Sequence, residues 1–223
     1  MARSLSGLGA HLARVGRTDA ASRALQEALG IIRDVARKNP DIATFLHDEA
    51  FCRECLGNLQ VATGRLDEAL QSYREVLDLV GRVGRDTPAY ARSREGALES
   101  RLGIGRALLR QGRVAEALTS LGQAVALGTA IAGRDPEVLH NLARAQALCS
   151  TAVGQGRTTR TTEERTEAER YAATAVKTLS QAVAAGYRNL PWIKRDPDLD
   201  PLRSRDDFKG LVNELERAQA MSE

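Results

Sequence analysis

Two cysteines stand at a spacing that could do chemistry. Cys52 and Cys55 form a Cys-x-x-Cys pair, the arrangement found in redox motifs and in one half of a zinc site. A zinc site needs about four ligands, and the third cysteine, Cys149, stands alone without a histidine cluster. The pair also lies inside a helical pattern with no strand before it, unlike a thioredoxin motif. We therefore interpret these cysteines as small buried residues of a helix and expect no metal ligand and no cofactor.

The histidines give no catalytic arrangement. His11, His47 and His140 are dispersed along the chain, and none has a nucleophile at close spacing. The chain contains no Gly-Lys-Ser/Thr phosphate loop, no Gly-x-Ser-x-Gly elbow, and no His-Arg-Asp or Asp-Phe-Gly segment of a protein kinase. We therefore expect no catalytic residue and no enzyme activity in these residues, although a kinase domain could be linked upstream.

Charge and composition narrow the class of partner. The 223 residues contain 32 Lys and Arg against 29 Asp and Glu, which gives a net charge of +3, and only 4% of them are aromatic. Because acids are interspersed with the arginines and stacking residues are few, nucleic acid is not an expected partner. No apolar run approaches the ~20 residues of a membrane span, so no membrane partner is expected. The odd cysteine count and the absence of a secretory signal favour the cytoplasm.

Two kinds of landmark recur along the chain with one period of 48 residues. The recurring glycines are Gly16, Gly64 and Gly112, and the recurring prolines are Pro40, Pro88 and Pro136. A glycine suits the left-handed residue that closes a helix, and a proline suits the first turn of the next one. Each repeat is therefore predicted to be a helical hairpin that bends at its glycine. The residues before the prolines, predicted as helix N-caps, are Asn39, Thr87 and Asp135.

Small and apolar residues recur at matching places in both halves of each hairpin. Ala69, Tyr73 and Val76 are offset by four and seven, which puts them on one helix face. The equivalent sets are Ala21, Leu25 and Ala28, and Ala117, Leu121 and Ala124. Gly9, Gly57 and Gly105 share one phase of the first helix, where a glycine costs about 1 kcal/mol against alanine. We infer that these glycines allow close helix packing, and that Gly103-Ile104-Gly105 is not a dinucleotide loop.

This pattern resembles the tetratricopeptide repeat. Leu56, Gly57, Gly64, Ala69 and Tyr73 carry the resemblance best. The usual period is shorter, near 34 residues, and Arg53 occupies the position where the family usually has tryptophan. The chain therefore looks like a long-helix variant of the family. The resemblance implies an all-α fold, an α-solenoid of about four helical hairpins with a C-terminal helical cap, wound into a right-handed superhelix.

The resemblance also implies a concave groove lined by the first helices, which would bind a peptide or protein. By repeat register, the candidate groove residues are Glu54, Asn58, Glu99, Arg106, Arg110, Asn141 and Gln146. Relatives that clamp a terminal carboxylate use Lys and Asn at fixed positions. The matching positions here hold Glu54, Asn58 and Gly103, so that clamp is expected to be absent. Arg106 and Arg110 are suited to an acidic segment of the partner.

The end of the chain departs from the 48-residue spacing. We predict a repeat array over residues 1–186, with units at about 2–39, 40–87, 88–135 and 136–186, followed by a capping segment over 187–223. The Asp196-to-Leu202 stretch carries two prolines and is predicted to form short turns, and Asp206-Asp207 is predicted to start a last helix. The stretch from Tyr187 to Leu215 is similar to the C-terminal repeat regions of large bacterial serine/threonine kinases.

Two functions follow from these interpretations. The favoured one is a non-catalytic scaffold or adaptor that binds protein. The alternative is the C-terminal regulatory or substrate-docking region of a bacterial serine/threonine kinase whose catalytic domain lies outside the chain. Because the first helix begins only a few residues before Leu8-Gly9, a further hypothesis is that an upstream repeat or domain covers this end.

Overall fold

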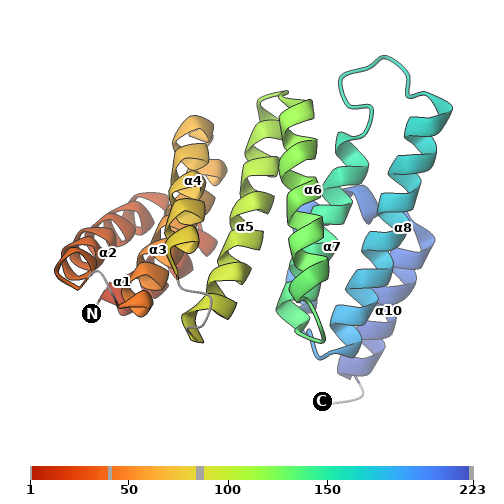
Figure 1. Ribbon diagram of the computed structural model, residues 1–223. Coiled ribbons are helices and arrows are strands. Elements are labelled where there is room, and N and C mark those ends of the chain that lie inside the picture. The colour runs from red at the N-terminus through yellow and green to blue at the C-terminus, as the bar shows by residue number, and fades with distance from the viewer. Residues whose placement is uncertain (1, 40–41, 84–87, 221–223) are drawn as a thin grey trace. The chain divides into compact units, whose positions relative to one another are not determined.

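The computed structural model describes residues 2–39, 42–83 and 88–220, and these residues form helices and no strand (Figure 1). The all-α prediction is confirmed. The helices are α1 (Ala2–Arg14), α2 (Thr18–Lys38), α3 (Ala43–Ala62), α4 (Leu66–Arg82), α5 (Pro88–Arg110), α6 (Val114–Ile131), α7 (Pro136–Ala152), α8 (Thr162–Ala184), α9 (Leu190–Ile193), the 3₁₀ helix η1 (Pro197–Leu202) and α10 (Asp206–Ala220).

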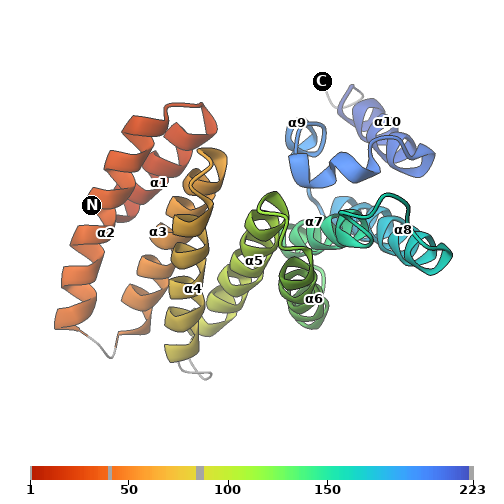
Figure 2. The same ribbon diagram turned by 90° about the horizontal axis from the view of Figure 1, so that it is seen from above.

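The chain forms two compact units, Met1–Gln111 and Gly112–Glu223. In the first unit, α1 packs on α2 and α3 packs on α4, while α5 packs on both α3 and α4 (Figure 2). In the second unit, α6 and α8 pack on α7, and η1 lies against α7. Consecutive helical hairpins are thus the organising element, as the repeats predicted. The predicted limits of the four repeats and of the capping segment stay predictions.

The bends of the hairpins fall at the predicted glycines. Gly64 has φ +77°, and its N–H donates to the carbonyl of Val61 at 3.1 Å. The next N–H, of Arg65, reaches back to Gln60 O at 2.8 Å. This pair of bonds is the Schellman ending of a helix, which requires a left-handed residue and therefore favours glycine. Gly16 makes the same pair of bonds, with Ala13 and through the following residue with Leu12.

The helix starts agree with the sequence at some places and not at others. The Asp135 carboxylate accepts hydrogen bonds from the N–H groups of Glu137 and Val138, at 2.9 and 3.0 Å, and so caps α7 as predicted. Asn39 was expected to cap α3 but ends α2 instead, where its Nδ2 donates to the Val35 carbonyl at 2.9 Å. Helix α3 begins later, at Ala43. The predictions for Pro40 and Thr87 lie outside the described residues.

Tyr73 is the centre of the core between α3, α4 and α5. The predicted face of Ala69, Tyr73 and Val76 is fully buried. A Cβ built on Gly57 would lie 2.8 Å from Tyr73 Cε1, and one built on Gly103 would lie 2.4 Å from Tyr73 Cζ. Real Cβ atoms do not come this close, so both backbones touch the phenol ring because they carry no side chain. The packing role of Gly57 is confirmed, and Gly103 adds a second such contact.

Gly9 repeats this close approach in the first hairpin. A Cβ built on Gly9 would lie 2.6 Å from Leu25 Cγ, and Leu25 is itself fully buried. Leu25 and Tyr73 stand at equivalent repeat positions, 48 residues apart. Gly105 is buried as well. One packing solution thus recurs in the first two hairpins.

Arg53 takes part in a buried ion-pair cluster. Its side chain is only 9% exposed, and its Nη2 lies 2.8 Å from Glu49 Oε1 on the same helix. Its Nη1 bonds to Glu75 on α4. A buried guanidinium is tolerated when carboxylates satisfy its donors. The cluster therefore joins α3 to α4 by charge.

Helix α6 is rich in apolar residues. Among the described residues it is the one helix that could cross a membrane by length and composition, with a mean hydropathy of 1.3. Its buried residues Ala117, Leu121 and Ala124 form one face, and α6 packs on α7. A helix in the core of a protein passes the same test, so this finding is weak support for a membrane.

Candidate functional site

A pocket opens in the first unit between α3 and α5. It has a volume of about 230 Å³. The residues that line it are His47, Ala50, Phe51, Glu54, Val80, Arg92, Ser93, Glu95, Gly96 and Glu99. Two of the predicted groove residues, Glu54 on α3 and Glu99 on α5, thus line one concave site. That this pocket belongs to a binding groove stays a prediction.

The lining combines an exposed aromatic ring with an excess of acid. The Phe51 side chain is 42% exposed, which is unusual for a large apolar residue. The lining includes three glutamates, Glu54, Glu95 and Glu99, and one arginine, Arg92. Burial and the nearby Arg92 lower the pKa of His47 below its ordinary value, so its imidazole is neutral at pH 7. The pocket is therefore suited to a cationic side chain with an apolar stem.

Asn58 and Arg106 meet beside this pocket at equivalent repeat positions. Arg106 Nη2 donates to Asn58 Oδ1 at 2.8 Å, and the Tyr73 hydroxyl donates to the same oxygen at 2.8 Å. Burial raises the pKa of Tyr73 to about 12, so its hydroxyl stays protonated and acts as a donor. The two residues thus link α3 to α5 through hydrogen bonds at the end of the Tyr73 ring.

Arg110 lies about one helical turn after Arg106 and is the last residue of α5. Its Nη1 donates to the carbonyl of Val61, near the end of α3. Its side chain is exposed. The five candidates of the first unit therefore lie on α3 and α5 as predicted by register: Glu54, Asn58, Glu99, Arg106 and Arg110. Whether they bind a partner stays a prediction.

The two candidates on α7 lie in a different environment. Asn141 is 8% exposed and Gln146 is 5% exposed. The Asn141 Oδ1 accepts a hydrogen bond from Arg144 at 2.9 Å. The side chains are thus part of the interior of the second unit, and their place in a groove stays a prediction.

A buried polar cluster in the second unit was not foreseen from the sequence. Arg144 on α7 lies 3.0 Å from Asp196 Oδ2 and 2.7 Å from Asp198 Oδ2, and both carboxylates are almost fully buried. His140, one turn earlier, stacks on Tyr187 with ring centroids 4.3 Å apart. The sequence did contain a signal, because an Asp-Pro-Asp segment rich in turns must satisfy its acids if it is buried. The cluster joins the segment after α8 to α7.

His140 is neutral in this cluster. Its Nε2 lies 3.7 Å from Asp196 Oδ2, a distance at which an ion pair would form if the ring were protonated. Burial, together with the charge of Arg144, lowers the pKa of His140 to about 3. At neutral pH the contact is therefore a stacked neutral ring beside a carboxylate, and His140 has a structural role.

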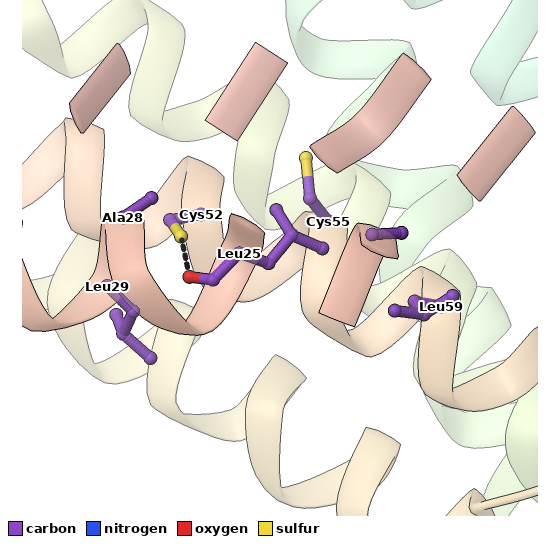
Figure 3. Close-up of a cluster of buried hydrophobic side chains, with 7 residues drawn as sticks. Leu25, Ala28, Leu29, Cys52, Cys55 and Leu59 are labelled. Carbon is purple, nitrogen blue, oxygen red and sulfur yellow. Dashed lines mark hydrogen bonds between the residues drawn. The ribbon is translucent and has the colours of Figure 1, made fainter. Parts of the chain in front are cut away.

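The cysteines are buried thiols. Cys52 Sγ donates to the carbonyl of Leu25 at 3.3 Å, and Figure 3 shows the sulfur of Cys55 pointing elsewhere. All three cysteines are unpaired. Burial raises the pKa of Cys52 and Cys55, and that of Cys149 to about 12, so none is a thiolate at neutral pH. The interpretation of the Cys-x-x-Cys pair as core residues is confirmed. In the described part of the chain, no group of acids, cysteines and histidines could hold a metal ion.

Three segments of the chain match family models of the tetratricopeptide repeat. They are residues 2–27, 56–87 and 97–136. These segments include the turn glycines of the first three hairpins, Gly16, Gly64 and Gly112. The sequence resemblance to this repeat is therefore supported by an independent comparison.

One solved structure is similar over the whole chain. It is a crystal structure of nearly identical TPR-like repeats from a protein of Podosopora anserina assigned to the kinesin light chains. The match has 19% identity and a TM-score of 0.49, and covers 99% of this chain and 96% of that one. No curated protein matches the chain.

Proposed function

We propose that the chain is a non-catalytic protein-interaction module that binds an extended peptide along α3 and α5 of its first unit. The three tetratricopeptide-repeat matches support a role in binding protein. The observation that carries the proposal is the pocket lined by Glu54 and Glu99, two residues that the repeat register also points to.

The charges along α5 define the spacing of charged residues in the bound peptide. Glu99 lines the pocket, while Arg106 and Arg110 follow on the same helix. Seven residues of helix separate Glu99 from Arg106, which corresponds to about 10 Å. An extended peptide covers that distance in about three residues. The bound segment therefore carries a Lys or Arg in the pocket and an Asp or Glu about three residues away, beside Arg106.

The Phe51 ring adds an apolar contact to this charge pattern. Long basic side chains bury their methylene stems on apolar surface while the charged head reaches an acid. Phe51, Ala50 and Val80 supply that surface in the pocket, and Glu54 and Glu99 supply the acids. A Lys or Arg of the partner therefore fits better than a purely apolar anchor.

A peptide display selection against the whole chain tests the proposal. The expected result is enrichment of a basic and an acidic residue about three positions apart. A selected peptide should bind Glu99→Lys at least about tenfold more weakly, because one charge-assisted contact becomes a repulsion. The readout is fluorescence anisotropy of the labelled peptide.

A charge exchange makes the test specific. Replacing the basic residue of the peptide by Glu should restore binding to Glu99→Lys. Glu27→Lys, which makes the same charge change on the exposed face of α2, should leave the original peptide's affinity unchanged. Equal binding of the original peptide by Glu99→Lys and by the unchanged chain would remove the groove from consideration.

The alternative function, a docking region of a bacterial serine/threonine kinase, rests on the resemblance of residues Tyr187 to Leu215. A kinase domain encoded upstream in the same reading frame would support it, and an isolated reading frame would favour the free adaptor. For both alternatives we propose a cytoplasmic location, since the three cysteines are unpaired.

A further inference from the structure

We propose that the second unit holds a separate binding site for a phosphate monoester, in a pocket formed where α7, α8 and the segment before α10 meet. The pocket has a volume of about 330 Å³. Three of its lining residues are arginines, Arg160, Arg165 and Arg205, and one is an acid, Glu169. The site is independent of the peptide groove, because all of its residues belong to the second unit.

The acid in the pocket is already neutralised by one of the arginines. Arg205 Nη1 lies 2.7 Å from both oxygens of Glu169, and its Nη2 lies 2.9 Å from Asp207 Oδ2. These bonds raise the pKa of Arg205 and lower the pKa of Asp207. Arg205 is therefore shared by two carboxylates, and the other two arginines of the pocket are Arg160 and Arg165.

Neither of these arginines has a carboxylate partner in the described part of the chain. Arg160 donates to the backbone carbonyls of Ser150 and Thr151, at 3.3 and 3.0 Å, in the last turn of α7. Arg165 is exposed on the first turns of α8 and makes no ion pair or side-chain hydrogen bond among the described residues. Arg160 and Arg165 thus supply two positive charges against the one surplus negative charge of Arg205, Glu169 and Asp207, and this net positive charge attracts an anion.

Neutral donors stand beside these charges. The hydroxyl groups of Thr151 and Ser204 line the pocket, and neither makes a side-chain hydrogen bond within the described residues. Ser204 and Arg205 directly precede α10, whose first N–H groups carry partial positive charge. Guanidinium groups and hydroxyls together provide more donors than a carboxylate can accept, and they match the three terminal oxygens of a phosphate.

The apolar part of the lining indicates an ester rather than the bare ion. Ala168, Ala172 and Pro201 line the same pocket. They provide contacts for a short organic group next to the phosphate. A phosphorylated side chain of a peptide and a small phosphate ester share this chemistry, and the experiment distinguishes them.

The test measures binding of N-acetyl-phosphoserine methylamide to the whole chain by NMR titration, with its unphosphorylated form, glycerol phosphate and inorganic phosphate as parallel probes. Saturable binding of the phosphoserine probe is expected, with no binding of the unphosphorylated form. Arg165→Gln should weaken it by about tenfold or more, the loss of one charge-assisted contact. Equal affinity for glycerol phosphate would assign the site to small esters, and tighter phosphoserine binding would assign it to peptides.

A control variant and a gain variant complete the experiment. Arg170→Gln removes the same charge from the exposed face of the same helix, where Arg170 is paired with Glu167, and should leave affinity unchanged. Glu169→Gln should tighten binding, since it frees Arg205 for the phosphate. Equal weakening by Arg165→Gln and Arg170→Gln would reveal attraction to overall charge only, and would overturn the proposal. Failure of the phosphoserine probe to bind, or tightest binding of inorganic phosphate, would overturn it as well.

Discussion

Tyr73 holds three helices at a single ring. Its edges and face touch the backbones of α3 and α5 at Gly57 and Gly103, and its hydroxyl bonds to Asn58. Interiors packed at this density lose stability when a methyl group is added, because no neighbour can move away. The space on both sides of the ring is therefore as important as the ring itself.

We expect Gly57→Leu to lower the free energy of unfolding by about 1–3 kcal/mol or more, because the new side chain collides with Tyr73. The measurement is urea unfolding followed by circular dichroism. The matched control is Gly30→Leu, since Gly30 is exposed in the middle of α2 and nothing lies within 4 Å of its added Cβ. That change should stabilise the chain by a few tenths to about 1 kcal/mol through helix propensity. A melting curve of Gly57→Leu equal to that of the unchanged chain would contradict the packing role.

Arg53 shows which contacts one helix determines and which it does not. Glu49 and Arg53 are four residues apart, a spacing that favours an ion pair on one helix. The second partner of Arg53, Glu75, is on the next helix. Such a partner depends on how two helices are rotated against each other, which spacing along one helix does not determine.

At the scale of elements, helix ends were predictable where backbone geometry allows one residue type. The left-handed turn at Gly64 almost requires glycine, and it was found where expected. Asn39 and Asp135 looked equivalent as N-caps, yet only Asp135 caps a helix start. An amide can also donate, and Asn39 uses its Nδ2 to bond a carbonyl at a helix end, which a carboxylate cannot do.

The packing of the segment that follows α8 depends on one arginine of α7, Arg144. We expect Arg144→Met to loosen residues 187–203, because it removes the guanidinium that pairs with the buried carboxylates of Asp196 and Asp198. Breaking a buried ion pair in this way typically costs about 3–5 kcal/mol. Hydrogen exchange should rise across residues 187–203 and stay unchanged in α3 and α4, which belong to the first unit.

The control for this experiment is Arg195→Met. Arg195 lies in the same segment but is exposed. This variant should exchange like the unchanged chain. If Arg144→Met also kept full protection of residues 187–203, the ion pairs would not be what holds the segment.

At the scale of the whole molecule, the free energy of unfolding should decrease both at acidic and at alkaline pH. The pKa of His140 is about 3 in the folded chain and near 6.5 in the unfolded one, so the unfolded state binds the extra proton between these values. Stability is therefore lost as pH falls below about 6.5, with a slope from this group on the order of 1.4 kcal/mol per pH unit. Cys149 and Tyr73, both raised to about 12, act in the opposite direction and reduce stability above pH 9–10.

The loss of stability at acidic pH is measured by denaturant unfolding between pH 4 and 7. Unfolding is followed by the fluorescence of Trp192, which lies in α9 of the second unit. His140→Phe keeps a ring that can stack on Tyr187 but cannot bind a proton. Its free energy of unfolding should therefore fall less steeply with decreasing pH, and the difference in slope should correspond to about one proton. An identical acid slope in His140→Phe would show that His140 is not responsible.

The whole-molecule features that followed from the sequence are those set by repetition. The period of 48 residues predicted helical hairpins and put Asn58 and Arg106 at equivalent repeat positions. The hydrogen bond between them was not predicted and comes from the structure. The same register placed Asn141 among groove residues, although it is buried in the second unit and bonded to Arg144. That environment comes from the segment after α8, which departs from the repeat and whose fold a periodic argument does not describe.

The three buried thiols have a practical consequence for anyone who wishes to attach a probe to this chain. Cys52, Cys55 and Cys149 are at most 8% exposed and stay protonated at neutral pH. Maleimides and other alkylating dyes react with accessible thiolates. A cysteine introduced on an outer helix face would thus be the preferred target for labelling, and the native cysteines could be left in place.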